Sequence, residues 1–126
     1  MMLLAFINER DAPPVRDQPH IDAASWRMFQ GASGELRLVV RRSEITFRTT
    51  TRVVSVSFER TVVQTTSGRT YHLAGPPETN EFVLEIIRAN AARAGLQTDN
   101  DVSDDFWHEL QAGRAGGPLG LLDPTA

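Results

Sequence analysis

The chain has 126 residues and a formal net charge of −3, a length that suits one domain with one hydrophobic core. It contains no cysteine, which excludes disulfide frameworks, thiolate zinc sites, iron–sulfur clusters and a cysteine nucleophile. All 13 basic residues are arginine, and the lack of lysine excludes a phosphate-binding P-loop lysine and Schiff-base catalysis.

The charge of the chain is segregated along the sequence. Residues 35–72 contain seven arginines against three glutamates, which gives this region a charge of +4. Residues 78–110 contain eight acidic residues against two arginines, which gives this region a charge of −6. Such an asymmetry suits contact with a charge-complementary protein or with a second copy of the same chain.

The N-terminal part is the least regular stretch of the sequence. Residues 3–7 form a short apolar run that predicts a buried strand, and a proline-rich connection follows it. This run is too short for a membrane helix and lacks the flanking features of a signal peptide, so we expect a cytoplasmic protein without membrane contact. Residues 22–31 fit either a short helix with Trp26 and Phe29 on one face, or a strand with Trp26 and Met28 on one side.

A two-residue alternation of apolar and polar side chains follows this stretch and predicts strands. The first three predicted strands cover residues 35–41, 44–50 and 53–58, and two more follow as a hairpin. β-Branched residues dominate these segments, as a half-solvated sheet favours. We therefore expect a mostly antiparallel sheet of four to six strands within residues 35–74. In the first of these strands Leu36, Leu38 and Val40 share one face, and in the second Ile45 and Phe47 share one face.

The turns determine the expected register of the last three strands. A tight turn between the first two of them pairs Val56 with Val63. A three-residue loop containing Gly68 then pairs Val63 with Leu73, whereas a two-residue loop shifts this pairing and flips the later side chains. We favour the longer loop because it keeps the apolar side chains on one face and turns His72 outward. That face consists of Val54, Val56, Phe58, Val63, Tyr71 and Leu73.

Two helices are predicted after the sheet, at residues 79–94 and at residues 104–112. Thr79 or Asn80 can cap the first helix, and Ser103 can cap the second, because their side-chain oxygens accept bonds from free backbone N–H groups. The apolar stripe of the first helix is expected to contain Phe82, Val83, Ile86, Ile87, Ala89 and Ala94.

The order of these elements predicts the fold class. A run of strands followed by helices is typical of an α+β fold, here with the first helix packed on the sheet. We expect residues 1–115 to form this single domain. Residues 116–126 are rich in glycine and proline and are expected to form a flexible tail.

His72 and Arg69 form the first of three functional patterns in the sequence. The pair suits a general base beside an arginine that binds an anion. A base needs a group that orients it, and no carboxylate stands at a suitable local spacing. We therefore favour a hairpin turn followed by an outward-facing strand residue.

The other two patterns resemble metal sites and depart from them at defining positions. Residues 99–110 match the first half of a calcium-binding loop, but the sixth position is Asp104 instead of glycine and the twelfth is Leu110 instead of glutamate. His108 begins a His-Glu pair like that of a zinc-protease helix, but Ala112 stands where the second histidine is needed. We expect a helix start with acidic residues near its positive end, and neither a metal nor a cofactor.

The arginines of the predicted sheet are the candidate binding residues. They are Arg37, Arg41, Arg48, Arg52 and Arg69, together with His72. Arginine is enriched at protein interfaces because its planar guanidinium stacks and makes paired hydrogen bonds. We expect a small non-enzymatic binding or regulatory protein that contacts another protein or itself, as inhibitors, immunity proteins and phage assembly subunits do.

Two alternatives remain open. A basic sheet face can follow a phosphate backbone, so a nucleic-acid-binding module is the first. Against it, Phe47, Phe58 and Tyr71 face inward in the expected register, which leaves no aromatic side chain for base stacking. The second alternative is a hydrolase whose catalytic residues meet only in the folded chain.

Overall fold

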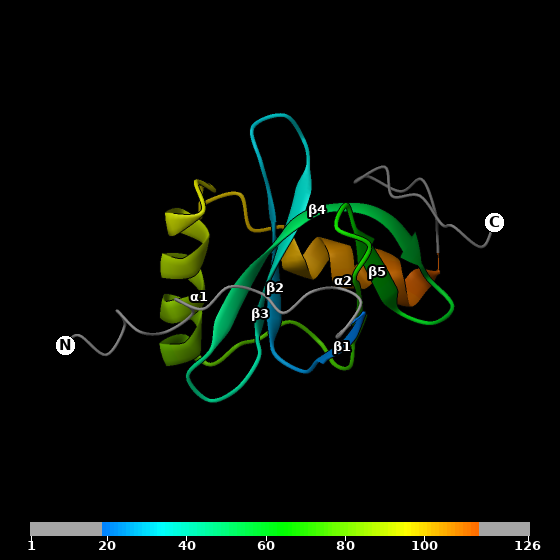
Figure 1. Cartoon of the computed structure of the whole chain (residues 1–126), viewed down its shortest axis with the longest axis horizontal. Helices are drawn as coiled ribbons and strands as arrows, with labels where there is room; N and C mark the ends of the chain where they lie inside the picture. The colour runs from blue at the N-terminus through cyan, green and yellow to red at the C-terminus, as the bar shows by residue number, and fades with distance from the viewer. Residues whose placement is uncertain (1–18, 114–126) are drawn as a thin grey trace.

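A computed structural model describes residues 19–113, and the predicted strand at residues 3–7 and tail at residues 116–126 lie outside them. Six strands form one sheet in the order β1-β6-β5-β4-β3-β2, and two helices follow (Figure 1). The strands are β1 (His20–Ala23), β2 (Trp26–Gln30), β3 (Leu36–Arg41), β4 (Phe47–Ser57), β5 (Val62–Thr65) and β6 (Thr70–Leu73). The helices are α1 (Glu81–Arg93) and α2 (Ser103–Ala112). The predicted α+β fold is confirmed, with every strand pair antiparallel except β1 and β6.

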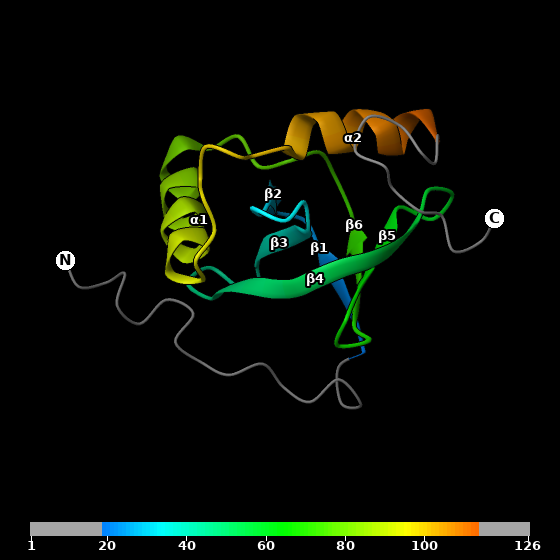
Figure 2. The same cartoon turned by 90° about the horizontal axis from the view of Figure 1, so that it is seen from above.

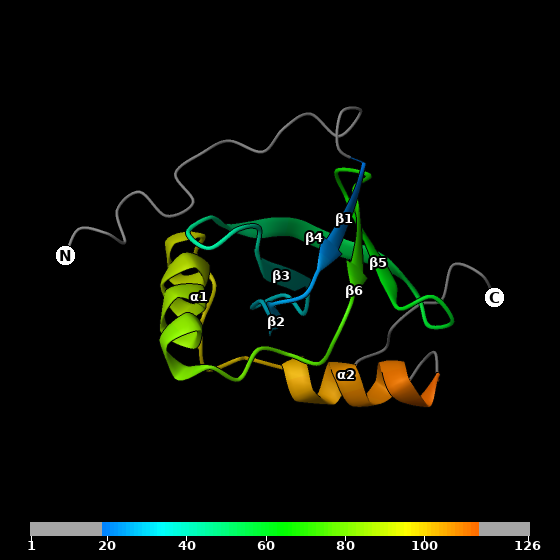
Figure 3. The same ribbon diagram turned by 90° about the horizontal axis from the view of Figure 1, so that it is seen from below.

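The sheet is rolled, because its two edge strands are almost continuous in sequence. β1 lies at one edge and β2 at the other, yet only Ala24 and Ser25 separate them. The N–H of Arg41 donates to the carbonyl of Ser25 at 3.0 Å, and the N–H of Ala74 donates to the carbonyl of Ala23 at 3.0 Å. The two edges therefore meet at this junction, and Figure 3 shows β1 continuing into β2. Of the two structures that fit residues 22–31, the strand is the correct one.

An inner core fills the concave side of the rolled sheet. Its fully buried members include Trp26 and Met28 of β2, on the same side as expected for a strand. α2 closes this core, with the ring of Phe106 meeting the ring of Trp26 edge-on at 6.1 Å between centroids. The Trp26 indole N–H donates to the carbonyl of Gly75 at 2.8 Å, so its one polar atom is satisfied. The other inner-core residues are Ile21, Ala23, Leu36, Leu38, Val40, Val56, Phe58, Val63, Tyr71, Leu73 and Leu110.

A separate outer core lies between α1 and the convex side of β2, β3 and β4. Figure 2 shows α1 beside β3 and β4, and α2 at a different side of the roll. Asn80 caps α1 by accepting a hydrogen bond from the N–H of Val83 at 3.1 Å, which confirms one of the two predicted caps. Thr49 of β4 donates its hydroxyl to the Asn90 side chain at 2.6 Å, which ties the helix to the sheet. The outer-core residues are Phe29, Val39, Phe47, Val83, Ile86, Ile87, Ala91 and Leu96.

A bulge in β4 overturns part of the predicted strand pattern. Residues 47–57 form one long strand where two strands were expected. Val56 pairs with Val63 as expected, but the register shifts between Val53 and Ser55. A bulge inserts one extra residue and reverses the alternation beyond it. Val54, predicted to face the core, is therefore 42% exposed.

The pairing of β5 with β6 differs from the prediction by two residues. Val63 pairs with Tyr71, not with Leu73. The three-residue loop is correct, but it comprises residues 66–68, because the N–H of Thr65 donates to the carbonyl of Arg69 at 3.0 Å. A two-residue shift keeps every side chain on its face, so the predicted apolar face of these two strands is still buried.

Two large apolar side chains that were predicted to face the core are exposed. Ile45 is 51% exposed because it lies in the turn before β4. Phe82 is 67% exposed because the buried stripe of α1 is turned away from it. Ala89, also predicted in this stripe, is exposed as well. The buried residues of α1 are Val83, Leu84, Ile86, Ile87, Asn90 and Ala91.

The segment before α2 covers the free edge of β2. The N–H of Gln30 donates to the carbonyl of Asn100 at 3.0 Å, and the N–H of Val102 donates to the carbonyl of Met28 at 2.9 Å. Ser103, predicted to be the helix cap, is instead the first residue of α2 and is fully buried. Its hydroxyl oxygen accepts a bond from the N–H of Met28 at 2.7 Å, so this side chain serves the strand and not the helix end.

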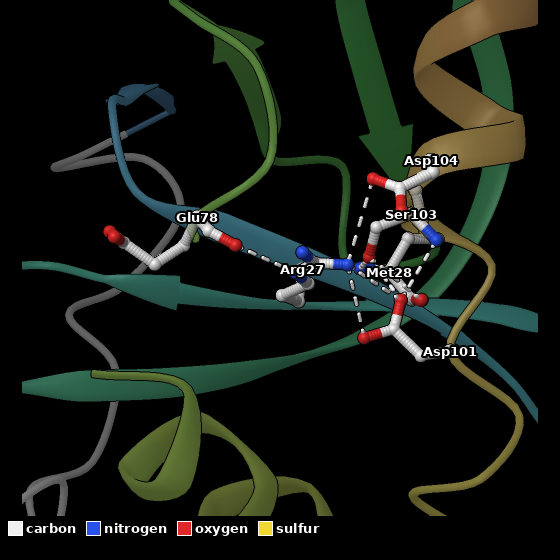
Figure 4. Close-up of polar contacts among 6 residues, drawn as sticks. All are labelled: Arg27, Met28, Glu78, Asp101, Ser103 and Asp104. Carbon is white, nitrogen blue, oxygen red and sulfur yellow. Dashed lines mark hydrogen bonds and ion pairs between the residues drawn. The ribbon is translucent and has the colours of Figure 1, made fainter. Parts of the chain in front are cut away.

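Arg27 strengthens this contact from the solvent side (Figure 4). Its Nε donates to the carbonyl of Glu78 at 2.9 Å, and its Nη1 lies 3.4 Å from Asp101 and 3.8 Å from Asp104. The Arg27 side chain is only 12% exposed, so its charge is better shielded from water than that of a surface arginine. Acidic residues that resembled a calcium loop in the sequence therefore pair with an arginine of β2.

We expect Phe106→Ala to lower the free energy of unfolding by about 3–5 kcal/mol, because it opens a cavity beside Trp26. Phe82→Ala is the matched control, since it removes the same side chain from an exposed position and should cost less than about 1 kcal/mol. Urea denaturation followed by tryptophan fluorescence measures both changes. Equal losses for the two variants would show that α2 does not close the inner core.

Candidate functional site

The start of α1 and the loop between β3 and β4 both border the outer core, and we call these two elements together the α1 foot. It consists of the exposed side chains of Ile45 and Phe82 together with Arg41. In Figure 1 the β3–β4 loop lies at the lower end of the molecule, as the first turn of α1 does, whereas Figures 2 and 3 draw the loop nearer to the last turn of α1. Phe47 and Val83, the neighbours of these elements in the outer core, belong to the same buried cluster.

Arg41 holds the β3–β4 loop in place. Its guanidinium carbon lies 5.7 Å from the centre of the Phe47 ring, a distance that suits a cation–π contact. Its Nε donates to the carbonyl of Ser43 at 3.1 Å, and its Nη2 donates to the carbonyl of Glu44 at 2.9 Å. Because these bonds order the loop, Ile45 is presented to solvent on a fixed backbone.

Glu78 fixes the other half of the α1 foot. The hydroxyl of Ser25 donates to its carboxylate, and the N–H of Asn80 donates to the same group at 3.0 Å. The Ser25 bond is the main reason why the pKa of Glu78 is lowered, and the positive charge of Arg41 adds to the effect. The entry into α1 is thereby anchored to the junction of β1 and β2, which positions Phe82.

The predicted arginines do not share one face. Arg48 pairs with Val40 of the inner core, so its side chain points to the concave side. Arg69 was expected at the surface, but it is only 3% exposed. It lies in the turn between β5 and β6, which faces the concave side as well. Burial lowers the pKa of Arg48, and the charges of Arg42 and Arg69 lower it further. These residues form a partly buried basic cluster, whereas Arg41 belongs to the α1 foot.

The other two arginines among the candidate binding residues, Arg37 and Arg52, lie together on the convex side. Arg37 and Arg52 are directly opposite each other in the pairing of β3 with β4. Both border a hollow beside the β2–β3 hairpin. The register shift that follows Arg37 in the pairing brings them together, and the alternation of the sequence does not indicate this shift.

His72 has a partner that local spacing did not reveal. Its Nδ1 lies 3.2 Å from the Asp22 carboxylate, and the Nε2 of His20 lies 3.5 Å from the same oxygen. His20 Nδ1 is also 2.9 Å from the Thr70 hydroxyl. The order hydroxyl, imidazole and carboxylate is that of a hydrolytic triad. However, Asp22 is 74% exposed, and water weakens the electrostatic activation that such a triad needs.

No family model, no curated protein and no solved structure matches this chain. Between residues 19 and 113, no three histidine, aspartate or glutamate side chains converge in a way that could hold a metal ion. In the same span, neither helix has the length and apolar character that a membrane crossing requires. The case for a function therefore depends on the geometry of the surfaces described above.

The Glu78 anchor makes stability depend on pH in a defined direction. The pKa of Glu78 is lowered from its ordinary value of 4.5, so folding favours the ionised carboxylate. Its contribution is complete well above that value and is lost as the pH falls through the lowered folded value. We expect Glu78→Gln to reduce the free energy of unfolding by about 1 kcal/mol at pH 7, with the difference from wild type closing between about pH 5 and 3.

Ser25→Ala tests the cause of this effect, because it removes the main hydrogen bond without changing any charge. It should show the same closing difference in urea denaturation at each pH. Glu85→Gln removes one charge from an exposed position of α1 and measures the effect of net charge alone. A Ser25→Ala difference that stays constant from pH 7 to 3 would contradict the role given to Glu78.

Proposed function

We propose that this chain is a non-enzymatic protein-binding domain and that it contacts its partner through the α1 foot. The observation that carries the proposal is the 67% exposure of Phe82 on a helix whose other large apolar side chains are buried. Ile45, 51% exposed, adds a second exposed apolar side chain from the β3–β4 loop. Aromatic, aliphatic and arginine side chains together are the composition of interface centres.

The energetics of the α1 foot support this proposal. Removing a phenylalanine side chain from water is worth about 1.5–3 kcal/mol, a gain that the isolated chain does not realise at Phe82. Arg41 is already ordered by Phe47 and by the loop carbonyls, so a partner that pairs with it has less side-chain entropy to restrict. The contacts of Glu78 fix the helix that carries Phe82. The surface is therefore organised before binding.

Nucleic-acid binding has less support from the same geometry. A phosphate backbone needs a continuous row of cations, whereas the predicted arginines diverge to the convex side, the concave side and the α1 foot. Phe47, Phe58 and Tyr71 are each at most 5% exposed, so none of them offers a surface for base stacking. The acidic residues that precede and begin α2 would also repel a polyanion.

We expect that replacing Phe82 abolishes the capture of the host protein that binds this chain. Affinity capture from a native host lysate, followed by mass spectrometry, compares wild type with Phe82→Ser and Ile45→Ser. Val54→Ser is the matched control, because Val54 is the third exposed large apolar residue of residues 19–113 and lies on β4. A protein retained by wild type and by Val54→Ser, but reduced at least tenfold with Phe82→Ser, supports the proposal; tenfold corresponds to about 1.4 kcal/mol.

Two results contradict the proposal. In the first, Phe82→Ser retains the same proteins as Val54→Ser at equal levels. In the second, the chain binds labelled DNA or RNA strongly at low salt, loses it as salt rises, and is unaffected by Phe82→Ser. Sedimentation of the purified chain shows whether the partner is a second copy, in which case Phe82→Ser should shift the dimer to monomer.

A further inference from the structure

A hollow of about 400 Å³ lies between the β2–β3 hairpin and the middle of β4, and we call it the arginine hollow. Its lining residues are Ser33, Glu35, Arg37, Thr51, Arg52 and Thr66. Figure 1 shows the β2–β3 hairpin and the α1 foot at opposite ends of the molecule. The arginine hollow is thus separate from the surface proposed for protein binding.

Two arginines line the arginine hollow, and neither forms an ion pair with a carboxylate of residues 19–113. Arg37 and Arg52 are directly opposite across β3 and β4, a position in which like charges repel. Arg37 donates its Nε to the carbonyl of Thr50 at 2.9 Å, which orients the group and leaves its outer nitrogens available. Among residues 19–113, no carboxylate lies within ion-pair distance of either arginine. A negative ligand would relieve this repulsion.

Glu35, the one acidic residue of the lining, is held by the hairpin instead. Its carboxylate accepts bonds from the Ser33 hydroxyl at 2.5 Å and from the Ser33 N–H at 3.2 Å. The Ser33 hydroxyl is the main reason why the pKa of Glu35 is lowered. The carboxylate also packs over Gly31, where a Cβ atom would stand 2.1 Å from Oε2, so only glycine leaves room for this arrangement. Glu35 therefore forms no ion pair with either arginine, and the charge of Arg37 makes only the smallest contribution to its lowered pKa.

Hydroxyl groups complete the set of donors around the arginine hollow. Thr51 and Thr66 contribute two, and the Thr51 oxygen accepts a bond from the N–H of Ser67 at 3.3 Å, which leaves its hydrogen to be donated elsewhere. Two planar guanidinium groups flanked by hydroxyls match the oxygens of a phosphoryl or carboxylate group, which arginine binds through paired hydrogen bonds. We infer that the arginine hollow is an oxyanion-binding site for such a group.

A titration of the ¹⁵N-labelled full chain with inorganic phosphate tests this inference by NMR at constant ionic strength. The amide resonances of Ser33, Thr51 and Thr66 should shift together and saturate. A parallel titration with acetate distinguishes the two sources of oxygens: stronger binding of phosphate indicates a phosphoryl ligand, and stronger binding of acetate a carboxylate ligand. Either saturating response supports the site.

Arg52→Ala should weaken the binding at least about tenfold, since it removes a charge-assisted hydrogen bond to the anion. Arg52 is exposed, so this change should leave the remaining amide spectrum unaltered and the variant folded. Arg52→Lys keeps the charge but not the planar fork, and should weaken binding to a smaller extent. Arg60→Ala is the matched control, because it removes an exposed arginine from the β4–β5 turn.

Three results would overturn the inference. The first is that the shifts in wild type saturate with neither anion. The second is that Arg52→Ala binds the anion as tightly as wild type. The third is that Arg60→Ala weakens binding as much as Arg52→Ala does. The last result would mean that the anions respond only to net charge. Because Phe82 is not involved, the outcome is independent of the test of the α1 foot.

Discussion

The structure depends on one nearly continuous segment, β1 followed by β2, which forms both edges of the sheet. Its parallel pairing with β6 joins residues about 50 positions apart, and ordering so long a loop costs conformational entropy. Burial offsets this cost, because Ile21, Ala23, Trp26 and Met28 all enter the inner core. Only when both edges are paired does the concave side enclose that core, which α2 then covers. α1 packs on the convex side of the sheet.

Rolling also determines where the charges lie. In a flat sheet the arginines of residues 35–72 would share a solvated face, whereas the roll and the β4 bulge send them to three places. Arg48 and Arg69 enter the concave side, Arg37 and Arg52 meet across two strands, and Arg41 stacks on Phe47. The acidic part of the chain partly neutralises the sheet from within the same molecule, through Arg27 and the segment before α2. Two residues of the acidic region, Asp101 and Asp104, are thus paired within the molecule, with an arginine that lies outside residues 35–72.

Local signals allowed the elements to be predicted, and non-local contacts account for the errors. The alternation in β3 and the stripe of α1 depend on residues close in sequence, and both elements form as expected. The β4 bulge is a shift in the register of its pairing with β5, so the exposure of Val54 was not predictable from the residues next to it in sequence. Ser103 was assigned to its own helix, although it bonds Met28 of a distant strand. Likewise, the acidic partner of His72 is Asp22, which only the pairing of β1 with β6 brings near.

The rolled sheet itself is open to one direct measurement, the cross-strand nuclear Overhauser effects of the full chain. We expect contacts between Ile21 of β1 and Tyr71 of β6 in parallel register, together with contacts between Trp26 of β2 and Val40 of β3. Both sets must occur in the same folded monomer, because they place neighbouring segments at opposite edges of the sheet. The rolled sheet would be contradicted by β1 and β2 contacting the same neighbouring strand, or by β1 lacking any contact with β6.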